Sequence, residues 1–264
     1  MHLHLGRSGA ALTAFLAGAT LLAGCGGSSV GNTATGRIRV VDASPNAGTA
    51  DILINGASAY GDMAYFTTAG NASQPASPYL YIGPQTGVPF TYTTSQSLPS
   101  GASATTNNFD LSQNQYYTAF LIGRYDTYSS SPSDPRFLQV VVPAPRASAN
   151  SSLATLRVLN AAPDAGFTTP TVNNVATPTA GSVNVSVGAP ATSFNGVTYA
   201  TASSYQTLAP GSNISVTVTL PGGGPVTTGT INLSAGTVYT LVVAENAIPN
   251  GVTPATYQLR LLSE

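Results

Sequence analysis

The chain has 264 residues, of which only 6% are charged, and 8 lysine plus arginine residues face 9 aspartate plus glutamate residues. Ordinary soluble domains carry about 25% charged residues. All of the basic residues are arginine, and both histidines, His2 and His4, stand in the N-terminal leader-like segment. The composition therefore argues against a nucleic-acid-binding protein, a Ser-His-Asp or Cys-His enzyme, and a zinc site built from His and Cys.

The first segment, residues 1–24, has the three parts of an export signal. Arg7 is the basic flank, residues 10–22 form an apolar core too short to span a bilayer, and small residues follow. The expected cleavage site reads Leu22, Ala23, Gly24 and Cys25. These four residues resemble a bacterial lipobox. The resemblance implies that Cys25 becomes the mature N-terminus, with a diacylglycerol on its sulfur and an acyl chain, such as palmitate, on its amine.

We therefore expect an N-terminal lipid to hold the mature protein to a membrane without spanning it. Residues 25–36 are small, polar and uncharged, which predicts a flexible tether. Bacterial lipoproteins with Asp after the cysteine stay at the inner membrane. Gly26 stands there instead, so the predicted location is the cell envelope, at the outer membrane. The alternative is a free Cys25 thiol behind a plain signal peptide.

Two segments of the chain repeat each other without gaps, RIRVVDASPNAG at 37–48 and TLRVLNAAPDAG at 155–166. The repeat is far longer than the period of a solenoid, which indicates the tandem duplication of a domain of about 110 residues. The predicted domains are residues 37–145 and 154–264, joined by a polar linker at 146–153.

Within each copy the apolar residues alternate with polar ones, as in half-buried strands. Residues 214–220 (ISVTVTL) follow this pattern, and so do Val88, Phe90 and Tyr92, although Pro89 suggests an edge strand. We expect strands in the first copy near residues 37, 50, 62, 77, 87, 105, 115 and 136. We expect strands in the second copy near residues 154, 182, 196, 203, 212, 227, 237 and 255. The pattern predicts an all-β chain of antiparallel sandwiches or barrels.

The spacing of Leu233, Gly236 and Tyr239 resembles the tyrosine corner of immunoglobulin-like and fibronectin-like sandwiches. Residues 111–117 repeat this spacing in the first copy, with Asn114 in place of the glycine. Asparagine is the next most tolerant residue at positive φ. The expected fold is therefore two tandem immunoglobulin-like or fibronectin-like antiparallel β-sandwich domains.

Three elements together resemble a known family: the opening Arg-x-x-x-Ala-x-Pro-(Asn/Asp)-Ala-Gly, the strand at 51–56 (DILING) and the L-x-x-G-x-x-Y-T element. The family is the bacterial domain-of-unknown-function family 4397, and the resemblance covers nearly all of the mature chain as two copies. It implies exported or envelope-anchored β domains without an established activity or binding site. Many members have histidine just before the Ala-Ser-Pro-Asp turn, where this sequence has Asp42 and Asn160.

The turns at Pro45-Asn46 and Pro163-Asp164 have ordinary turn chemistry. The alternative is a calcium site made by the oxygens of Asp42, Asn46 and Asp51. Their spacing matches no calcium loop, so the sequence predicts no metal.

The tyrosines could form a stacking surface for sugars or partner chains. Tyr79, Tyr81 and Tyr116 alternate within expected strands and are interpreted as core edges or corners. Tyr125 and Tyr128 differ, because they lie in an insertion, RYDTYSSSPSDPR, that the second copy lacks. We take these two as candidate ligand contacts, with a disordered connector as the alternative reading.

The expected function is that of a non-enzymatic, lipid-anchored envelope protein with a structural, adhesion or partner-binding role. Its expected partners are the membrane, through the lipid, and a protein or glycan of the envelope; no nucleic acid, cofactor or catalytic residue is predicted. One alternative is a carbohydrate-binding module that uses the loop tyrosines. The other is a hydrolase, which needs two of six aspartates to converge: Asp42, Asp51, Asp62, Asp110, Asp126 and Asp134.

Overall fold

The structure is a computed structural model that describes residues 35–45, 49–66, 79–94, 106–123, 138–162, 171–172, 175–176, 181–221, 223–246 and 256–264. The signal segment, Cys25 and the lipobox lie outside the described residues, as do Tyr125 and Tyr128. Within the described ranges there is no helix with the length and apolar character needed to cross a membrane.

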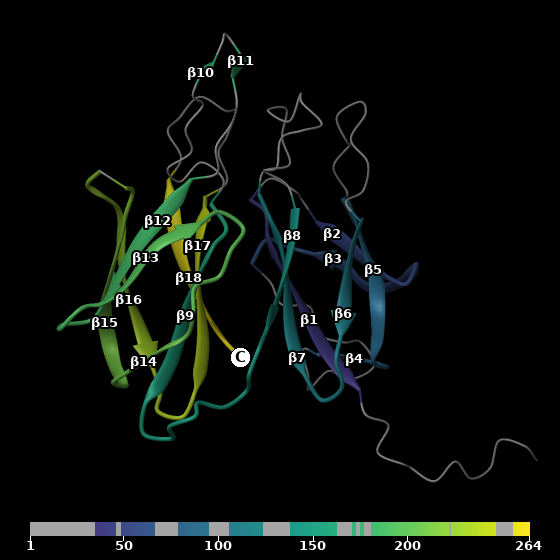
Figure 1. Cartoon of the computed structure of the whole chain (residues 1–264), viewed down its shortest axis with the longest axis horizontal. Coiled ribbons are helices and arrows are strands. Elements are labelled where there is room, and N and C mark those ends of the chain that lie inside the picture. The colour runs from purple at the N-terminus through teal and green to yellow at the C-terminus, as the bar shows by residue number, and fades with distance from the viewer. Residues whose placement is uncertain are drawn as a thin grey trace, which may run out of the picture. The chain divides into compact units, whose positions relative to one another are not determined.

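The first repeat is a sandwich of two four-stranded sheets (Figure 1). Its inner sheet has the order β4 (Leu80–Ile82), β1 (Gly36–Ala43), β7 (Tyr116–Ile122) and β8 (Leu138–Pro143). Its outer sheet has the order β3 (Ala57–Met63), β2 (Ala50–Ile54), β5 (Gln85–Thr94) and β6 (Thr106–Leu111).

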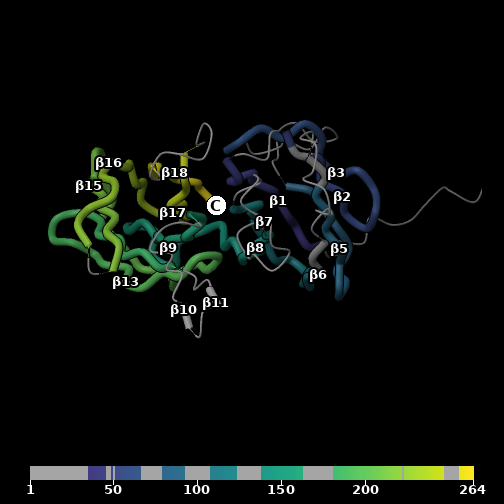
Figure 2. The backbone as a smooth tube through the Cα atoms, turned by 90° about the horizontal axis from the view of Figure 1, so that it is seen from above, coloured from purple at the N-terminus to yellow at the C-terminus, as the bar shows by residue number. Residues whose placement is uncertain are grey.

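The second repeat has the same arrangement. Its inner sheet has the order β14 (Gln206–Leu208), β9 (Ala154–Asn160), β17 (Val238–Glu245) and β18 (Tyr257–Ser263). Its outer sheet has the order β13 (Thr192–Thr198), β12 (Ser182–Val187), β15 (Gly211–Thr219) and β16 (Pro225–Leu233). A short pair, β10 (Thr171–Val172) and β11 (Val175–Ala176), precedes β12. Figure 2 separates the two layers of this repeat, with β9 and β17 in one and β13, β15 and β16 in the other.

These sheets confirm the expected class, an all-β chain of two tandem sandwiches. One pairing in each repeat is parallel, however: β1 pairs with β7, and β9 pairs with β17. The parallel pair lies at the centre of each inner sheet and brings the starts of its two strands to the same end. Arg37 is therefore in register with Tyr116, and Thr155 with Val238.

Each sandwich encloses its own apolar core, and a third core lies between the two repeats. We call this third contact the seam. It is formed mainly by the faces of the inner sheets that point away from their own sandwiches: Val41, Ala43, Phe120, Ile122 and Val142 from the first repeat, and Leu159, Ala161, Tyr199, Val242 and Ala244 from the second. Burying a large apolar side chain contributes about 1.5–3 kcal/mol, so the seam is a substantial stabilising contact.

The two tyrosine corners are confirmed. The backbone N–H of Ser112 donates to the Tyr117 hydroxyl at 3.2 Å, and that of Ser234 donates to the Tyr239 hydroxyl at 3.0 Å. Asn114 takes a φ of 57° and Gly236 a φ of 72°. Asn114 thus adopts the same left-handed conformation as Gly236, the glycine at the equivalent position of the second repeat.

The interpretation of Pro89 as a sign of an edge strand is wrong. Its strand, β5, lies between β2 and β6, paired on both sides. The Pro89 carbonyl accepts the N–H of Asn55, a residue of the β2–β3 turn, at 3.0 Å. The Pro89 nitrogen, which carries no hydrogen, is on the same side of the strand as this carbonyl and faces Asn55, just beyond the end of β2. The missing N–H therefore costs no hydrogen bond between β2 and β5.

Candidate functional site

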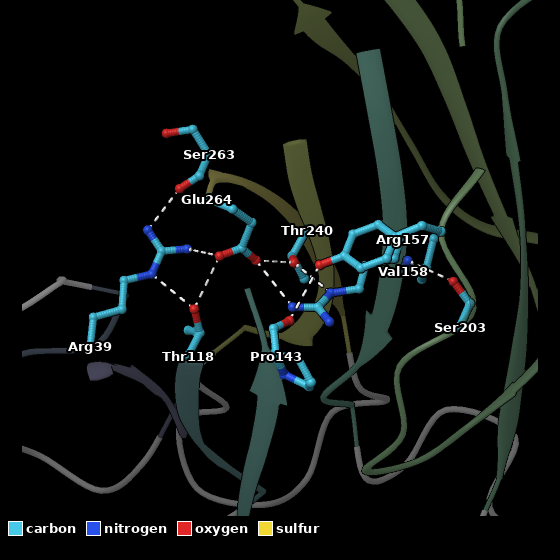
Figure 3. A network of polar contacts seen from close by, with 10 residues as sticks. Arg39, Thr118, Pro143, Arg157, Val158, Ser203, Thr240, Ser263 and Glu264 are labelled. Atoms are coloured by element: carbon cyan, nitrogen blue, oxygen red, sulfur yellow. Dashed lines mark hydrogen bonds and ion pairs between the residues drawn. The ribbon is translucent and has the colours of Figure 1, made fainter. Parts of the chain in front are cut away.

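A buried polar network lies at one end of the seam and is centred on the side chain of Glu264 (Figure 3). Its two partners, Arg39 on β1 and Arg157 on β9, occupy equivalent positions in the two repeats. Nη2 of Arg39 lies 2.5 Å from Oε2 of Glu264, and Nη2 of Arg157 lies 3.2 Å from Oε1. The Glu264 side chain is 0% exposed. One carboxylate therefore joins an arginine from each repeat.

Two threonines at equivalent positions complete the network. Nε of Arg39 donates to Oγ1 of Thr118, and Nε of Arg157 donates to Oγ1 of Thr240, each at 2.9 Å. Both threonine hydroxyls in turn donate to Glu264. Every oxygen of the carboxylate thus accepts from an arginine and a threonine. A buried charge needs such a complete set of hydrogen bonds, because the cost of its desolvation otherwise outweighs the attraction of the ion pair.

Two guanidinium groups share one carboxylate, and other groups stabilise the extra positive charge. Nη1 of Arg39 donates to the Ser263 carbonyl at 2.7 Å. The Cζ atom of Arg39 lies 5.4 Å from the ring centroid of Tyr79, and that of Arg157 lies 4.6 Å from the ring centroid of Tyr205. Such cation–π contacts disperse the charge over the rings.

The other end of the seam is polar as well. The Tyr65 hydroxyl of the first repeat donates to the Glu245 carbonyl of the second and accepts from Nε2 of Gln258 at 2.7 Å. The guanidinium of Arg260 lies over the Phe66 ring, with Cζ 5.5 Å from the centroid. Contacts of fixed geometry at both ends of an apolar contact set the register of one repeat on the other.

A second group of side chains continues from the Glu264 network to the surface. We call Arg37, Tyr81, Tyr116 and Arg146 the arginine–tyrosine cluster. Arg37 is in register with Tyr81 on β4 and with Tyr116 on β7. The Cζ atom of Arg37 lies 5.1 Å from the Tyr81 centroid and 4.7 Å from that of Tyr116, so two rings flank one guanidinium.

Within the cluster, Tyr116 also contacts Arg146, and it contacts Tyr79 outside the cluster. Cζ of Arg146 lies 5.2 Å from the Tyr116 centroid, and a hydrogen bond with the Tyr116 hydroxyl raises the pKa of Arg146 above its ordinary value. The Tyr79 ring meets the Tyr116 ring edge to face at 5.1 Å and leads to Arg39. Tyr81 is 42% exposed and Arg146 is exposed, so this end of the cluster faces solvent.

Comparison with known proteins agrees with the duplication seen in the sandwiches. The family model described as a domain of unknown function (DUF4397) matches residues 36–167 and 174–259. The chain belongs to this family. No curated protein matches the sequence. The two DUF4397 copies confirm the resemblance drawn from the repeated motifs, while the family description names no activity.

The two DUF4397 copies differ at the arginine–tyrosine cluster. Thr155 and Val238 occupy the positions of Arg37 and Tyr116, and Thr207 occupies that of Tyr81. The second copy makes the same three-strand register without any aromatic or cationic side chain there. The fold therefore does not require the cluster, which belongs to the first copy alone.

The copies also differ at Asp42 and Asn160, which occupy equivalent positions in the two repeats. Asp42 is 0% exposed, and burial raises the pKa of its carboxyl to about 7 although the Ser44 N–H donates to Oδ1 at 2.9 Å. Its Oδ2 has no hydrogen-bond partner among the residues that the structure describes. Asn160 instead accepts from the Ala162 N–H at 3.1 Å and donates through Nδ2 to the Val197 carbonyl at 3.1 Å.

The aspartates proposed for calcium or for hydrolysis have other roles where the structure describes them. Asp51 accepts the N–H of Asp62, and Asp110 accepts the N–H of Gly87, both at 2.9 Å. Asp51 is exposed, whereas Asp42 is fully buried. Asn46, Asp126 and Asp134 lie outside the described residues. In the part of the chain that the structure describes, no three His, Cys, Asp or Glu side chains gather as a metal site would need.

The Glu264 network was not predicted, although the sequence contains a signal for it. Arg39 and Arg157 are aligned in the two repeated segments, each inside an apolar strand, in a chain with 8 basic residues. An arginine kept at the same buried position in both copies indicates a partner shared between them. Tyr81 was interpreted as a core edge, but it is exposed because it belongs to the short edge strand β4.

Proposed function

We propose that this protein is a non-enzymatic, lipid-anchored component of the bacterial cell envelope whose two repeats act as one rigid structural or partner-binding unit. The observation that carries the proposal is the seam. A shared apolar core and the Glu264 network join the repeats, so a load or a partner acting on one repeat is transmitted to the other. This property suits a scaffold or an adhesin.

The distribution of reactive groups supports a role without catalysis. The sequence after Cys25 contains no histidine and no lysine. Asp42, whose pKa lies near neutrality, is fully buried in the first sandwich and has no contact with solvent. A general acid or base must reach its substrate, so this carboxyl is a poor candidate for that role.

The lipobox sequence supports the anchor, and Gly26 after Cys25 supports the outer membrane as its location. The test is metabolic labelling with an alkyne analogue of palmitate, followed by fractionation of the envelope. We expect label and protein together in the outer-membrane fraction. Cys25→Ser should remove both, whereas the neighbouring change Ser28→Ala should leave both in place. An unlabelled wild-type chain in the soluble fraction would disprove the anchor.

A carbohydrate-binding module is the second candidate, because the exposed Tyr81 ring lies against a guanidinium and has the character of a sugar-stacking platform. A glycan array separates the two candidates. Binding that Tyr81→Ala removes would favour the module. Crosslinking to envelope proteins with no glycan signal would favour the structural role.

A further inference from the structure

We propose that the arginine–tyrosine cluster docks on the anionic phospholipid headgroups of the membrane that holds the Cys25 lipid. This inference rests on the proposed lipid anchor and adds an orientation to it. The protein would then have a fixed orientation, with one end of the inner sheet of the first repeat against the bilayer.

The first argument is the place where the tether enters the sandwich. The Thr35 carbonyl accepts the Asn114 N–H at 3.0 Å, and the Arg37 N–H donates to the Gln115 carbonyl at 2.9 Å. The chain therefore enters β1 at the residue that begins the cluster. Cys25 precedes Thr35 by ten positions, a length that can span at most about 35 Å. The tether thus holds the cluster within a short distance of the lipid surface.

The second argument is the chemistry of the side chains. Arginine donates to phosphate oxygens in a planar, two-pronged geometry, and tyrosine is enriched at the level of lipid headgroups. Arg146 is exposed and Arg37 is partly exposed. Nε of Arg37 is buried and has no hydrogen-bond partner among the described residues, so only the outer part of this guanidinium reaches solvent. The exposed end of the cluster therefore offers cationic donors beside an amphipathic ring.

The third argument is the balance of charge at this end of the sheet. Among the described carboxylates, Asp51, Asp62 and Asp110 belong to strands of the outer sheet. Asp42 lies toward the far end of β1 from Arg37, and Glu245 is at the far end of β17 from Val238. Glu264 is already bound by Arg39 and Arg157. The positive charges of Arg37 and Arg146 thus face solvent without a carboxylate bound to them in the described structure, and an anionic surface would attract them.

The strength of the contact fits a tethered protein. An arginine close to an anionic membrane strengthens binding about fivefold, so two arginines give about 30-fold, too little to hold a free protein. A short tether raises the local concentration into the millimolar range, so the contact forms far more often than it would for a free protein. The cluster would therefore orient a protein that its lipid already holds.

The experiment uses the absence of tryptophan from the sequence. Tyr81→Trp introduces a single fluorophore into the cluster. The lipidated full chain is reconstituted in vesicles of phosphatidylcholine with about 30% phosphatidylglycerol, which supplies the anionic surface, or of phosphatidylcholine alone. We expect blue-shifted emission and quenching by brominated lipid on the anionic vesicles, and neither on the neutral ones. Added salt should reverse the shift, because it screens exposed charges.

Matched variants assign the effect to the cluster. Thr207→Trp places the fluorophore at the equivalent position of the second repeat and should report no shift. Arg37→Gln with Arg146→Gln, in the Tyr81→Trp background, should abolish the shift. Arg146→Gln alone should reduce the affinity about fivefold, and it keeps the test valid if the change at Arg37 disturbs folding.

The outcomes separate this inference from the proposed anchor. A lipidated chain whose Tyr81→Trp emission is the same on both vesicle types overturns the inference and leaves the anchor standing. If Cys25 carries no lipid, the anchor fails, and the chain is instead attached to the same vesicles through an N-terminal hexahistidine tag and a chelating lipid. A Tyr81→Trp shift on the anionic vesicles alone then supports the inference, and equal emission on both vesicle types overturns it. A shift with a soluble anionic polysaccharide and none with vesicles also overturns it, in favour of a glycan site.

Discussion

Asp42 and Asn160 share one backbone position but differ in their hydrogen bonds. Asp42 keeps a buried oxygen without a partner, and burial raises the pKa of its carboxyl to about 7 from an ordinary value of 3.8. Between these two values the folded protein holds a proton that the unfolded chain releases. The free energy of unfolding therefore falls as the pH rises through this window, and it stays low above pH 7.

Replacing Asp42 by asparagine should remove this loss. A shift of about three pKa units corresponds to about 4 kcal/mol, so the wild type should lose up to that amount between pH 4 and pH 8. Asp42→Asn should keep its stability across this range, because its amide stays neutral at every pH in it. Urea denaturation at pH 4, 6 and 8 measures this difference.

The converse change, Asn160→Asp, is the control in the second repeat. It should add a loss of stability at high pH, because it places a carboxyl where the Asn160 amide now donates to the Val197 carbonyl. Equal pH profiles for the wild type and Asp42→Asn would contradict the assignment of the titration to Asp42.

At the scale of elements, local patterns predicted the strands well. Alternation located β15, and the spacing of Leu233, Gly236 and Tyr239 located the corner before β17. The same patterns could not predict the parallel pairing of β1 with β7, because strands far apart in sequence are paired by the topology of the whole sandwich. Nor could they predict the seam. The apolar run in β17 (VYTLVVAE) indicates burial on both faces but not what covers the second face.

The tyrosine corners give a prediction at this scale. Tyr239→Phe removes the acceptor for the Ser234 N–H and should lower the free energy of unfolding by about 1–2 kcal/mol. Tyr117→Phe should act in the same direction in the first repeat. Chemical denaturation measures both changes. Tyr81→Phe, on an exposed edge residue, is the control and should have little effect; equal losses in all three variants would argue against the corners.

At the scale of the whole molecule, the seam should make the two repeats unfold together. Calorimetry of the wild type is expected to give one transition, because separating the repeats exposes the seam core and the Glu264 network. Two well-separated transitions would contradict the view of the repeats as one unit. The candidate site was harder to predict than the fold, since it depends on side chains that meet only after both repeats are in place.

Glu264→Gln should weaken this unit. The change leaves Arg39 and Arg157 buried without a carboxylate, and breaking a buried pair in this way costs about 3–5 kcal/mol. Calorimetry should show a lower transition temperature. Asp51→Asn is the matched control, because it removes an exposed carboxylate that accepts one backbone N–H and should cost far less.

The sharing of Glu264 has a consequence for how such a contact can arise. Arg39 with Thr118 and Arg157 with Thr240 are equivalent groups that meet at one acidic side chain. In a dimer of identical subunits every group occurs twice, so a carboxylate at this place would meet its own copy and be repelled. When two copies are fused in one chain, a residue need not occur twice. A single carboxylate, Glu264, can then lie between two equivalent Arg–Thr groups.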